Sequence, residues 1–567
     1  MAVPIIIIMD INALLIEAIQ KALESAGKEF NLTNIPSVTL APTPKKEFGD
    51  LSTNIAMQVC KLNTGCKPEV VASYMCDLLK ENAARGTLAG QIEQVCVKPP
   101  AFINFFFSNK AVYDVISQIE KQKDAFGKIS QPGKGKKVIV EFVSANPTGP
   151  LTVAHARQAV VGGAICNVLE FFGWKVTREY YVNDEGAQID LLGDSIYARY
   201  AEFLGKKIEI PENGYQGDYI KDIAQQLYKK YGDRFKDIAP KDRKIFSDYG
   251  MDCVMKEIKK DLADIHVVFD NYTAQHKLTS SDKVKAALEL LKKKGFVYEK
   301  EGAVWFKSTE FKDDKDRVLI KNDGSYTYLA PDIAYHKEKY DKGFDRLIDL
   351  WGPDHHGYVA RMKAAQKALG HIDTSLDILI VQLVSVYRDG VLVRMSKRSG
   401  DFITLREVID EVGPDVAKFF FLTRKMNSHL DFDLELAKKQ SLENPVYYIQ
   451  YAHARICGIL EHNKTKDQVE LKGADPSLLK EEEELALLKK LREYPEILSS
   501  AYEALEPYRI TDYLLELASQ FHSFYTKHKV VSESVQLTQA RLVLVSCVKV
   551  VISNALGLLG ISQPEKM

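Results

Sequence analysis

The amino-acid sequence lacks any large excess of charge. Its 567 residues include 76 lysines and arginines against 77 aspartates and glutamates, so the formal net charge at pH 7 is −1. No overall electric field therefore draws the protein to nucleic acid or to anionic lipid, and any such partner has to bind a local basic patch. This absence lowers the expectation of nucleic-acid binding without removing it.

The sequence also lacks closely paired cysteines. Its eight cysteines are scattered along the chain, with no CxxC pair among them. That spacing argues against a zinc knuckle or a disulfide framework, and it predicts reduced thiols in a cytoplasmic protein.

Long apolar runs are missing as well. No stretch approaches the roughly 20 apolar residues that a membrane span needs, so we expect no membrane partner. The start, "MAVPIIIIMDINALLIEAIQKAL", has a short apolar run without a basic flank, and Asp10 interrupts it. Apolar residues at helical spacing follow Asp10, which favours a docked amphipathic helix over a signal peptide.

What the sequence does contain is enough apolar material for a large core. It is 46% hydrophobic and 27% charged, the composition of an ordinary soluble globular protein. The length suggests several domains. Residues 1–126 alternate helical patterns with strand-like pieces, which predicts an α+β domain. The stretch "GKISQPGKGKK" (127–137) then marks a boundary, because glycine, proline and lysine dominate it.

The next segment, 134–435, has the pattern of an α/β domain. Its short runs "KVIVEFV", "WKVTREYYV", "RLIDLWG" and "LDILIVQLVSVY" are separated by helical stretches, which predicts a Rossmann-like parallel sheet wound by crossover helices. A more helical and charged segment at about 190–300 is interpreted as an insertion. Four amphipathic patterns in 440–567 predict an all-α helical bundle.

The stretch "SANPTGPLTVAHARQAVVGG" (144–163) directly follows the run "KVIVEFV". A buried strand, a Pro/Gly turn and a helix start meet there, and His155 lies near the first helical turn. A doubly wound sheet binds ligands beyond the carboxyl ends of its strands, where helix N-termini suit phosphate. The small residues Ala154 and Ala156 would let a flat base approach the backbone. A capping or core histidine is the alternative at this stage.

A second stretch, "VLVRMSKRSGDFITL", places Arg394, Ser396, Lys397 and Arg398 in a loop flanked by glycine. Three neighbouring cations repel one another unless anionic oxygens lie between them, so a phosphate site is a natural use. A solvated basic loop is the alternative.

Together the two stretches resemble the paired signatures of class I aminoacyl-tRNA synthetases. "TVAH" (Thr152–His155) stands where that class has its HIGH motif, and "RMSKR" (Arg394–Arg398) stands for KMSKS. Within the class, the chain resembles arginyl-tRNA synthetases over essentially its whole length, in the order and spacing of "KEFGDLSTNIAMQ", "EFVSANPTGPLTVAHAR", "YVNDEGAQI", "YTYLAPDIAYH", "LWGPDHHGY", "MSKRSGDFITL", "YAHARICGIL" and "LGLLGI". The motif "YVNDEGAQI" assigns no role to Asp184 or Gln188.

The resemblance implies an ATP site with His155, Ser396 and Lys397 as its catalytic residues. The positions that match the ATP contacts of the family are Thr152, Ala154, His155, Gly352, Asp354, His355, Met395 and Lys397. Thr152 replaces the first histidine of HIGH, and its hydroxyl can donate a hydrogen bond without charge, at a cost of ~1–2 kcal/mol. Gly149 stands where many family members carry a compensating lysine, so Lys397 supplies the catalytic cation.

A zinc site at "WGPDHHGY" is the rival interpretation of that motif. Its adjacent histidines, His355 and His356, point in different directions, and no third ligand is evident. We therefore predict no structural metal, and Mg²⁺ only in company with ATP.

An arginine site needs carboxylates, because guanidinium is planar, always charged and best met by a bidentate anion. Glu141 ends an apolar run, a poor place for an unpaired charge. Asp332 follows Tyr328 by four residues, which offers an aromatic face for a cation. By resemblance, Glu141, Tyr328 and Asp332 recognise the side chain of arginine, while Ser144 and Asn146 hold its α-amino end. An edge glutamate and a helix-capping aspartate are the alternatives.

The resemblance also assigns tRNA-binding parts. Residues 1–126 correspond to a domain that binds the tRNA elbow, with Phe102 and Asn104 on the D-loop by stacking and edge hydrogen bonds. The stretch "AFINFFF" could equally be a buried strand, and Phe105 and Phe107 are expected in the core. Residues 440–567 correspond to a DALR-type anticodon-binding domain, whose candidate contacts are Tyr448, Tyr451, Arg455 and Met567.

The activity that the resemblance implies is arginine–tRNA ligation by a cytoplasmic monomer. L-arginine reacts with ATP to give arginyl-adenylate and pyrophosphate, and the arginyl group then passes to the terminal adenosine of tRNA-Arg. Two alternatives stay open: another adenylate-forming nucleotidyl transferase, and a synthetase-derived RNA-binding protein without catalytic activity.

Overall fold

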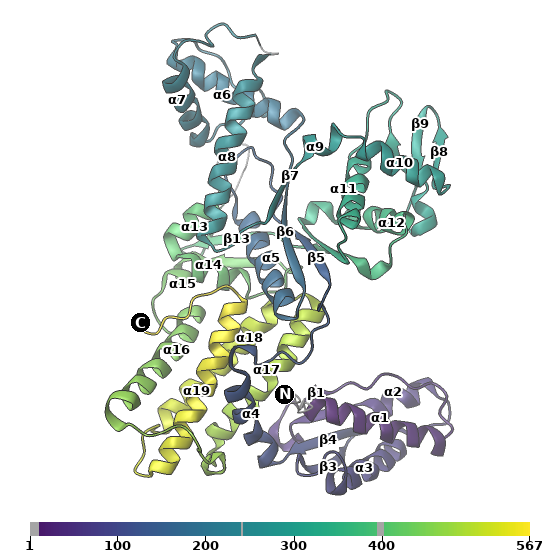
Figure 1. Ribbon diagram of the computed structural model, residues 1–567, viewed down its shortest axis with the longest axis vertical. Coiled ribbons are helices and arrows are strands. Elements are labelled where there is room, and N and C mark those ends of the chain that lie inside the picture. Colours follow the sequence, from purple (N-terminus) through teal and green to yellow (C-terminus); the bar gives the residue numbers. More distant parts are fainter. Residues whose placement is uncertain (1–10, 240–241, 394–401) are drawn as a thin grey trace, which may run out of the picture.

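The computed structural model describes residues 11–239, 242–393 and 402–567. Five regions are visible in Figure 1: a central sheet, a helical module above it, a module of helices and strands beside it, a helical bundle below it, and an N-terminal domain next to the bundle. The central sheet and the bundle share one continuous hydrophobic core. The candidate site lies in the central sheet.

The N-terminal domain packs helices against a four-stranded antiparallel sheet with the order β1-β2-β4-β3. Its elements are α1 (Ile11–Glu29), β1 (Ala41–Pro42), β2 (Leu51–Thr53), α2 (Ile55–Leu62), α3 (Pro68–Arg85), β3 (Ile92–Lys98) and β4 (Phe102–Phe107). Helix α1 buries apolar side chains at helical spacing, as the sequence predicts. In β4, Ile103 and Phe105 are fully buried.

One expectation about the cysteines is wrong. Cys60, in α2, and Cys66, just after it, are joined as a disulfide. The six other cysteines are free thiols. The turn that follows α2 brings the two positions together, and the spacing of the cysteines alone did not predict that turn.

The central sheet has five parallel strands in the order β12-β11-β5-β6-β7. They are β5 (Lys137–Glu141), β6 (Lys175–Val182), β7 (Asn271–Ala274), β11 (Arg346–Trp351) and β12 (Leu376–Ile380). The inner strands β5 and β11 are almost continuously apolar, since helices cover both faces of a parallel sheet. Strand order reverses between β5 and β11, which is the topological switch point of this sheet.

Two modules interrupt the sheet along the chain. The first is helical, with α6 (Ala187–Phe203), α7 (Asp218–Tyr231) and α8 (Lys244–Asp264). The second combines a small antiparallel sheet with helices: α9 (Gln275–Thr279), α10 (Lys283–Lys293), β8 (Val297–Lys300), β9 (Ala303–Phe306), β10 (Arg317–Ile320), α11 (Leu329–Asp341) and α12 (Val359–Leu369). Strand β7 lies between them, so the segment 190–300 contains an edge strand of the main sheet. Four half-exposed or exposed residues give β7 little apolar signal.

After β12 the chain forms a smaller three-stranded sheet and short helices. They are β13 (Val384–Arg388), β14 (Val391–Leu392), α13 (Leu405–Val412), α14 (Pro414–Phe421), β15 (Leu430–Asp433) and α15 (Leu434–Lys438). Strand β13 pairs in parallel with β15 and antiparallel with β14. The segment 394–401, which holds the second signature stretch, lies outside the described residues.

The C-terminal part is the predicted helical bundle. Its long helices are α16 (Pro445–His462), α17 (Glu482–Ala504), α18 (Tyr508–Lys527) and α19 (Val535–Leu558). Helix α19 is long and apolar enough to cross a membrane by length and composition, and most of its apolar stretch is buried inside the protein. The expectation that no stretch approaches that length was therefore wrong, and the packing of α19 against α16, α17 and α18 accounts for its composition.

The N-terminal domain is fastened to the bundle along α17. Lys489 forms an ion pair with Asp50, 2.5 Å from nitrogen to oxygen. Arg492 donates to the carbonyl of Ala111 at 2.9 Å and lies 4.4 Å from the ring centroid of Phe107. Ala111 belongs to α4 (Asn109–Gln122), the helix that leads from the N-terminal domain towards the sheet. Contacts of α17 therefore hold the N-terminal domain against the helical bundle.

Helix α5 (Val153–Phe171) lies directly against β5 because Gly162 has no side chain. A Cβ at Gly162 would lie 2.4 Å from the ring of Phe142, a fully buried side chain that follows Glu141. Such a contact forces the helix, the ring or the strand end to shift.

We expect Gly162→Ala to lower the melting temperature, by an amount that corresponds to about 1–3 kcal/mol of overpacking. Gly458→Ala in α16 is the matched control, since a Cβ there meets no described atom within 4 Å. That control should raise stability by about 0.5–1 kcal/mol through helix propensity. Thermal unfolding of both variants measures the difference, and an unchanged melting temperature for Gly162→Ala would contradict the close packing.

Candidate active site

The switch point brings the ends of β5 and β11 to one edge of the sheet. Strand β5 ends at Glu141 and β11 ends at Trp351, and the two strands pair in parallel. The chain that follows β5 forms the turn before α5, whereas Gly352 and a 3₁₀ turn follow β11. Parallel strands place all these following residues on the same side of the sheet, so both predicted halves of the site meet there.

Three acidic side chains form a row across the sheet. Asp349 on β11, Glu141 on β5 and Glu179 on β6 occupy the same register position of neighbouring parallel strands. Residues paired in this way project from the same face of a sheet. Asp349 and Glu179 are 1% and 2% exposed, and the side chain of Glu141 is 12% exposed. A row of buried carboxylates must be neutralised by cations or by hydrogen bonds.

Helix α11 supplies the side chains that contact two members of the row, Glu141 and Asp349. The ammonium of Lys339 lies 2.6 Å from Glu141 Oε2 and 3.0 Å from Asp349 Oδ1. His336 Nε2 lies 2.7 Å from Asp349 Oδ2, and His336 Nδ1 lies 2.8 Å from the carbonyl of Asp332. Both ring nitrogens of His336 therefore face oxygen acceptors.

Glu179 is held by hydroxyl groups. Tyr335 donates to Glu179 Oε1 at 2.9 Å, and Thr273 of β7 donates to the same oxygen. Asp332, in the first turn of α11, accepts a hydrogen bond of 2.7 Å from the hydroxyl of Tyr358. Around the carboxyl end of β5 the described residues therefore place more carboxylates than cations. A cationic ligand is what completes such a site.

The pKa values follow from this arrangement. Burial raises the pKa of Glu141, and the attraction of Lys339 opposes that rise. Burial raises the pKa of Asp332 as well, opposed by the hydrogen bond from Tyr358. Burial also acts to raise the pKa of Asp349, but Lys339 and His336 outweigh it and hold this pKa well below its usual range. Glu141 and Asp332 are thus the carboxylates that gain most from a further cation.

The turn after β5 is conformationally strained. Val143 and Ser144 have φ angles of 69° and 38°, in the left-handed region that side chains other than glycine rarely adopt. The hydroxyl of Ser144 donates to Glu141 Oε1 at 3.1 Å and accepts the N–H of Tyr181 at 3.0 Å. Strain of this kind costs about 1–3 kcal/mol per residue and persists where surrounding contacts enforce it. Here the strained conformation of Val143 and Ser144 turns the chain back over the end of β5.

Asn146 follows in the same turn and donates to the side chain of Gln188 at 2.6 Å. This contact links the turn to the start of α6. Asp184 accepts the backbone N–H of His276 at 3.0 Å, which ties the end of β6 to the residues after β7. The motif that contains Asp184 and Gln188 thus connects neighbouring strand ends around the site.

Tyr328 lies differently from the sequence-based expectation. It precedes α11 and is 83% exposed, while the aromatic side chain that contacts Asp332 is Tyr358. Tyr358 closes the 3₁₀ turn Pro353–Tyr358 after β11. In that turn Asp354 and His355 are exposed, and His355 Nε2 lies 3.5 Å from Asp354 Oδ2. No group of histidine, cysteine and acidic side chains suited to a metal occurs among the described residues.

The first signature stretch forms a capped helix start. Thr152 is the N-cap of α5, and His155 Nδ1 accepts the backbone N–H of Thr152 at 3.2 Å. A nitrogen that accepts a hydrogen bond carries no proton, so this arrangement places the ring proton of a neutral His155 on Nε2. Ala154 is partly exposed beside it, whereas Ala156 is buried. Thr152 thus sets the tautomer of His155 through its backbone.

The predicted residues Arg394, Met395, Ser396, Lys397 and Arg398 of the second stretch lie outside the described residues. The chain that follows them is bonded to the first stretch. Val153 donates to the carbonyl of Ile403 at 3.3 Å, and Leu405 donates to the carbonyl of Leu151 at 2.7 Å. This antiparallel bridge brings the residues after the second stretch to the start of α5.

Arg157 makes a second connection from α5. It is fully buried, and its guanidinium donates to the carbonyls of Gln382, Lys425 and Ser428 at 2.8–3.0 Å. Burial lowers its pKa to about 10. Its Nε has no partner among the described residues. Arg157 therefore holds the segments before β13 and β15 against the helix that carries His155.

The predicted tRNA contacts divide into buried and accessible groups. Asn104 is only 3% exposed and donates to the carbonyl of Phe48 at 2.7 Å, so its amide faces the N-terminal domain and not solvent. Burial of Asn104 does not match the expected base-reading role, because strand β4 is covered there. Phe102, in the same strand, is partly exposed.

Aromatic side chains gather on α16 and α18. The rings of Tyr448 and Tyr451 lie 4.4 and 5.9 Å from that of His522. Arg455 donates to the hydroxyl of Tyr525 at 2.9 Å and is exposed. Met567, at the end of the chain, is 50% exposed. Partly exposed rings beside a guanidinium form a surface on which bases can stack.

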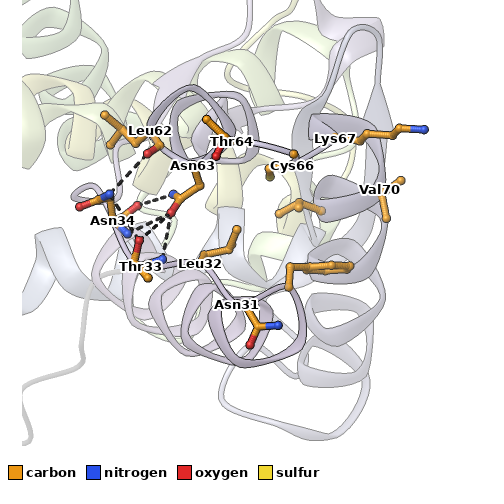
Figure 2. Close-up of a pocket in the computed structure, with 13 residues that line it drawn as sticks. Asn31, Leu32, Thr33, Asn34, Leu62, Asn63, Thr64, Cys66, Lys67 and Val70 are labelled. Carbon is orange, nitrogen blue, oxygen red and sulfur yellow. Dashed lines mark hydrogen bonds between the residues drawn. The ribbon is translucent and has the colours of Figure 1, made fainter.

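A cavity of about 470 Å³ lies elsewhere, in the N-terminal domain. Figure 2 shows that Asn63 bridges its wall through hydrogen bonds to Thr33 and Asn34. Cys66 and Lys67 line another side of it. It contains none of the predicted site residues, and it is far from the switch point in the fold.

The important residues that sequence reasoning missed are His336, Lys339, Asp349 and Glu179. A signal was present for each of them. His336 and Lys339 follow Asp332 at spacings of four and seven residues, which places all three on one face of a helix. Asp349 and Glu179 are charged residues inside runs that otherwise predict buried strands.

The parallel sheet with its switch point between β5 and β11, and the start of α5 beside it, define a Rossmann-like domain, and the family models give its class. Residues 115–430 match the family model described as tRNA synthetases class I (R), catalytic domain. Residues 13–107 match the arginyl tRNA synthetase N terminal domain, and residues 449–567 match the DALR anticodon binding domain. The chain belongs to the arginyl-tRNA synthetase family, and the predicted fold class is confirmed.

Individual relatives agree with this assignment. The chain is 48% identical over 560 residues to an arginine–tRNA ligase of Citrifermentans bemidjiense, covering 97% of this chain and 99% of the relative. It is 45% identical over 556 residues to that of Syntrophotalea carbinolica, with coverage of 97% and 98%. The solved arginyl-tRNA synthetase of Thermus thermophilus is 20% identical, with a TM-score of 0.76 over 98% of this chain and all of that one, and shows the shared fold.

Asp332 should destabilise the protein at neutral pH when no ligand is bound. Its folded pKa is raised by burial, so the charged form costs stability above that pKa, and the cost disappears below the unfolded value near 4. We expect Asp332→Asn to raise the melting temperature at pH 8, with a gain that shrinks as the pH falls towards 4. Asp341→Asn, at an exposed ion pair on the same helix, is the control and should change little. A lower melting temperature for Asp332→Asn at pH 8 would refute the expectation.

Proposed function

We propose that the protein, an arginine–tRNA ligase, binds the guanidinium of L-arginine at the end of the acidic row and ATP beside it at the start of α5. The observation that carries the proposal is the excess of buried carboxylates around Glu141, with a second carboxylate, Asp332, held by Tyr358. A fixed cation of planar shape meets such a site best.

The arginine side uses Glu141 and Asp332 for the guanidinium, with Tyr328 available from the surface to cover it. Ser144 and Asn146 receive the α-amino end, since both lie in the strained turn that follows Glu141. An analogue without the positive charge leaves the carboxylates unpaired in a buried place. Selectivity of this kind comes from a polar mismatch, which discriminates far more strongly than a difference in size.

The ATP side uses the helix start and both signature stretches. His155 donates through Nε2, the nitrogen left protonated by its bond to Thr152. Thr152, Ala154, Gly352, Asp354 and His355 border the nucleotide, and Met395, Ser396 and Lys397 complete the site from the second stretch. Mg²⁺ arrives with the phosphates, which are its preferred ligands together with water. Positioning and neutralisation of the phosphate charge supply the catalysis.

The first step joins the arginine carboxylate to the α-phosphorus of ATP and releases pyrophosphate. In the second step, a hydroxyl of the terminal adenosine of tRNA-Arg attacks the arginyl carbonyl and releases AMP. The tRNA lies along the N-terminal domain and the helical bundle, with Phe102 at the elbow and with Tyr448, Tyr451, Arg455 and Met567 at the anticodon. The buried Asn104 supports strand β4 and does not read a base. The protein acts as a monomer in the cytoplasm.

Arginine-dependent exchange of pyrophosphate into ATP tests this function directly. We expect exchange with L-arginine and not with other amino acids, measured with and without tRNA-Arg. Exchange driven by a different acid, or RNA binding without any exchange, would replace the proposal by one of the two alternatives.

The Asp332→Asn variant tests the arginine site. Loss of one charged hydrogen-bonding partner, worth ~1.5–3 kcal/mol, should lower kcat/KM for arginine roughly 10- to 150-fold. The preference for arginine over citrulline should narrow, because the neutral amide suits the neutral ureido group better. Asp341→Asn is again the control. Arginine kinetics identical to those of the wild type would remove Asp332 from the site.

A further inference from the structure

Lys339 is a buried lysine at the acidic row of the sheet. It lies on α11 with a side chain that is 1% exposed, and its ammonium is shared between Glu141 and Asp349. The ammonium also lies 4.4 Å from the ring centroid of Tyr335. A lysine of this kind is out of reach of water and of dissolved salt, so nothing else can take over its charge.

We propose that Lys339 is a positioning residue for arginine recognition, which acts by holding the Glu141 carboxylate in the orientation and charge state that a guanidinium requires. The proposal rests on the proposed function, since it concerns the same arginine site. It extends that function to a residue that does not itself touch the substrate.

The orientation follows from two contacts on opposite oxygens of Glu141. Lys339 binds Oε2 at 2.6 Å, and the hydroxyl of Ser144 donates to Oε1 at 3.1 Å. These two contacts fix the plane of the carboxylate. Each carboxylate oxygen has two lone pairs, so acceptor capacity remains for a guanidinium N–H.

The charge state follows from the register of the strands. Glu141 and Asp349 are paired neighbours in the sheet, and adjacent strands lie about 4.8 Å apart. Two carboxylates at that spacing in a buried place cannot both stay ionised unless a cation lies between them. Lys339 is that cation. Burial opposes its charge, but the two carboxylates outweigh burial and raise the pKa of Lys339.

Other titratable groups also face Glu141, and each has a partner that limits its influence. Asp349 is held by His336 as well as by Lys339. Glu179, on the other side in the row, is held by Tyr335 and Thr273. Among the described residues, the titratable groups that interact with Glu141 or pair with it in the sheet include Lys339, His336 and Tyr335 from α11, Asp349 from β11, and Glu179 and Tyr181 from β6.

Removal of the ammonium alone should therefore protonate Glu141 or Asp349 near neutral pH. A protonated Glu141 cannot form an ion pair with guanidinium, so arginine binds more weakly and the loss grows as the pH falls. In the proposed function, ATP binds at the start of α5 and not at this pair. The two substrates should respond differently, and a general defect of folding would affect both.

The experiment compares Lys339→Met with Lys337→Met in pyrophosphate exchange, from pH 6 to pH 9. Lys337 lies on the same helix in a surface ion pair with Asp341. We expect Lys339→Met to raise KM for arginine at least about tenfold at pH 7, to leave KM for ATP within about twofold, and to move the acid limb of kcat/KM for arginine to higher pH. Lys337→Met should match the wild type in all three. Equal changes in both KM values, or an unmoved acid limb, would overturn the proposal.

A double-mutant cycle keeps the test decisive if Lys339→Met alone does not fold. Glu141→Gln combined with Lys339→Met removes both charges of the pair, which avoids leaving one of them buried alone. If Lys339 acts through Glu141, the double variant should have the same kcat/KM for arginine as Glu141→Gln. A further tenfold loss would refute the proposal. Failure of the proposed function is separate, because the wild type would then show no arginine-dependent exchange at all.

Discussion

The arrangement depends on one electrostatic constraint, the burial of three carboxylates side by side in a parallel sheet. Asp349, Glu141 and Glu179 share one register position, so folding alone brings their charges together. Helix α11 resolves most of that conflict by delivering Lys339 and the hydroxyl of Tyr335 to the same face. The neutralisation is incomplete around Glu141. In the proposed function, the guanidinium of arginine supplies the positive charge that the fold leaves out around Glu141.

The second half of the chemistry depends on how α5 is held. Arg157 secures three carbonyls before β13 and β15, and the backbone bridge from Leu151 and Val153 secures the chain after the second signature stretch. Both connections start from the helix that carries His155. The two signatures are far apart in sequence, yet their flanking residues are bonded to one helix. The N-terminal domain and the bundle are joined through α17, so the two surfaces expected to bind tRNA are also fixed relative to each other (Figure 1).

Local signals in the sequence were sufficient for the inner strands and for the four long helices, because apolar runs and helical periodicity are properties of short segments. They were insufficient for β7, which is four residues long and lies at the edge of the sheet. They also could not show which face of α11 meets the sheet, and the roles of His336 and Lys339 depend on that. The same cause explains why Tyr358, and not Tyr328, contacts the Asp332 carboxylate. Tyr358 belongs to a turn that follows β11, and local sequence signals do not show that this turn packs against α11. Strand register and helix orientation are long-range properties, and the site is built from them.

The same features that define the site weaken the fold around it. Val143 and Ser144 are strained, Asp332 and Glu141 are carboxylates whose pKa values burial raises, and the buried guanidinium of Arg157 is met by carbonyl oxygens. Each of these is unfavourable in the free protein and has to be offset by the large core that the sheet shares with the bundle. A guanidinium relieves the charge part of that cost, whereas a neutral side chain of similar shape leaves it in place. The proposed selectivity for arginine therefore originates in the free protein, from carboxylates that are buried before the substrate binds.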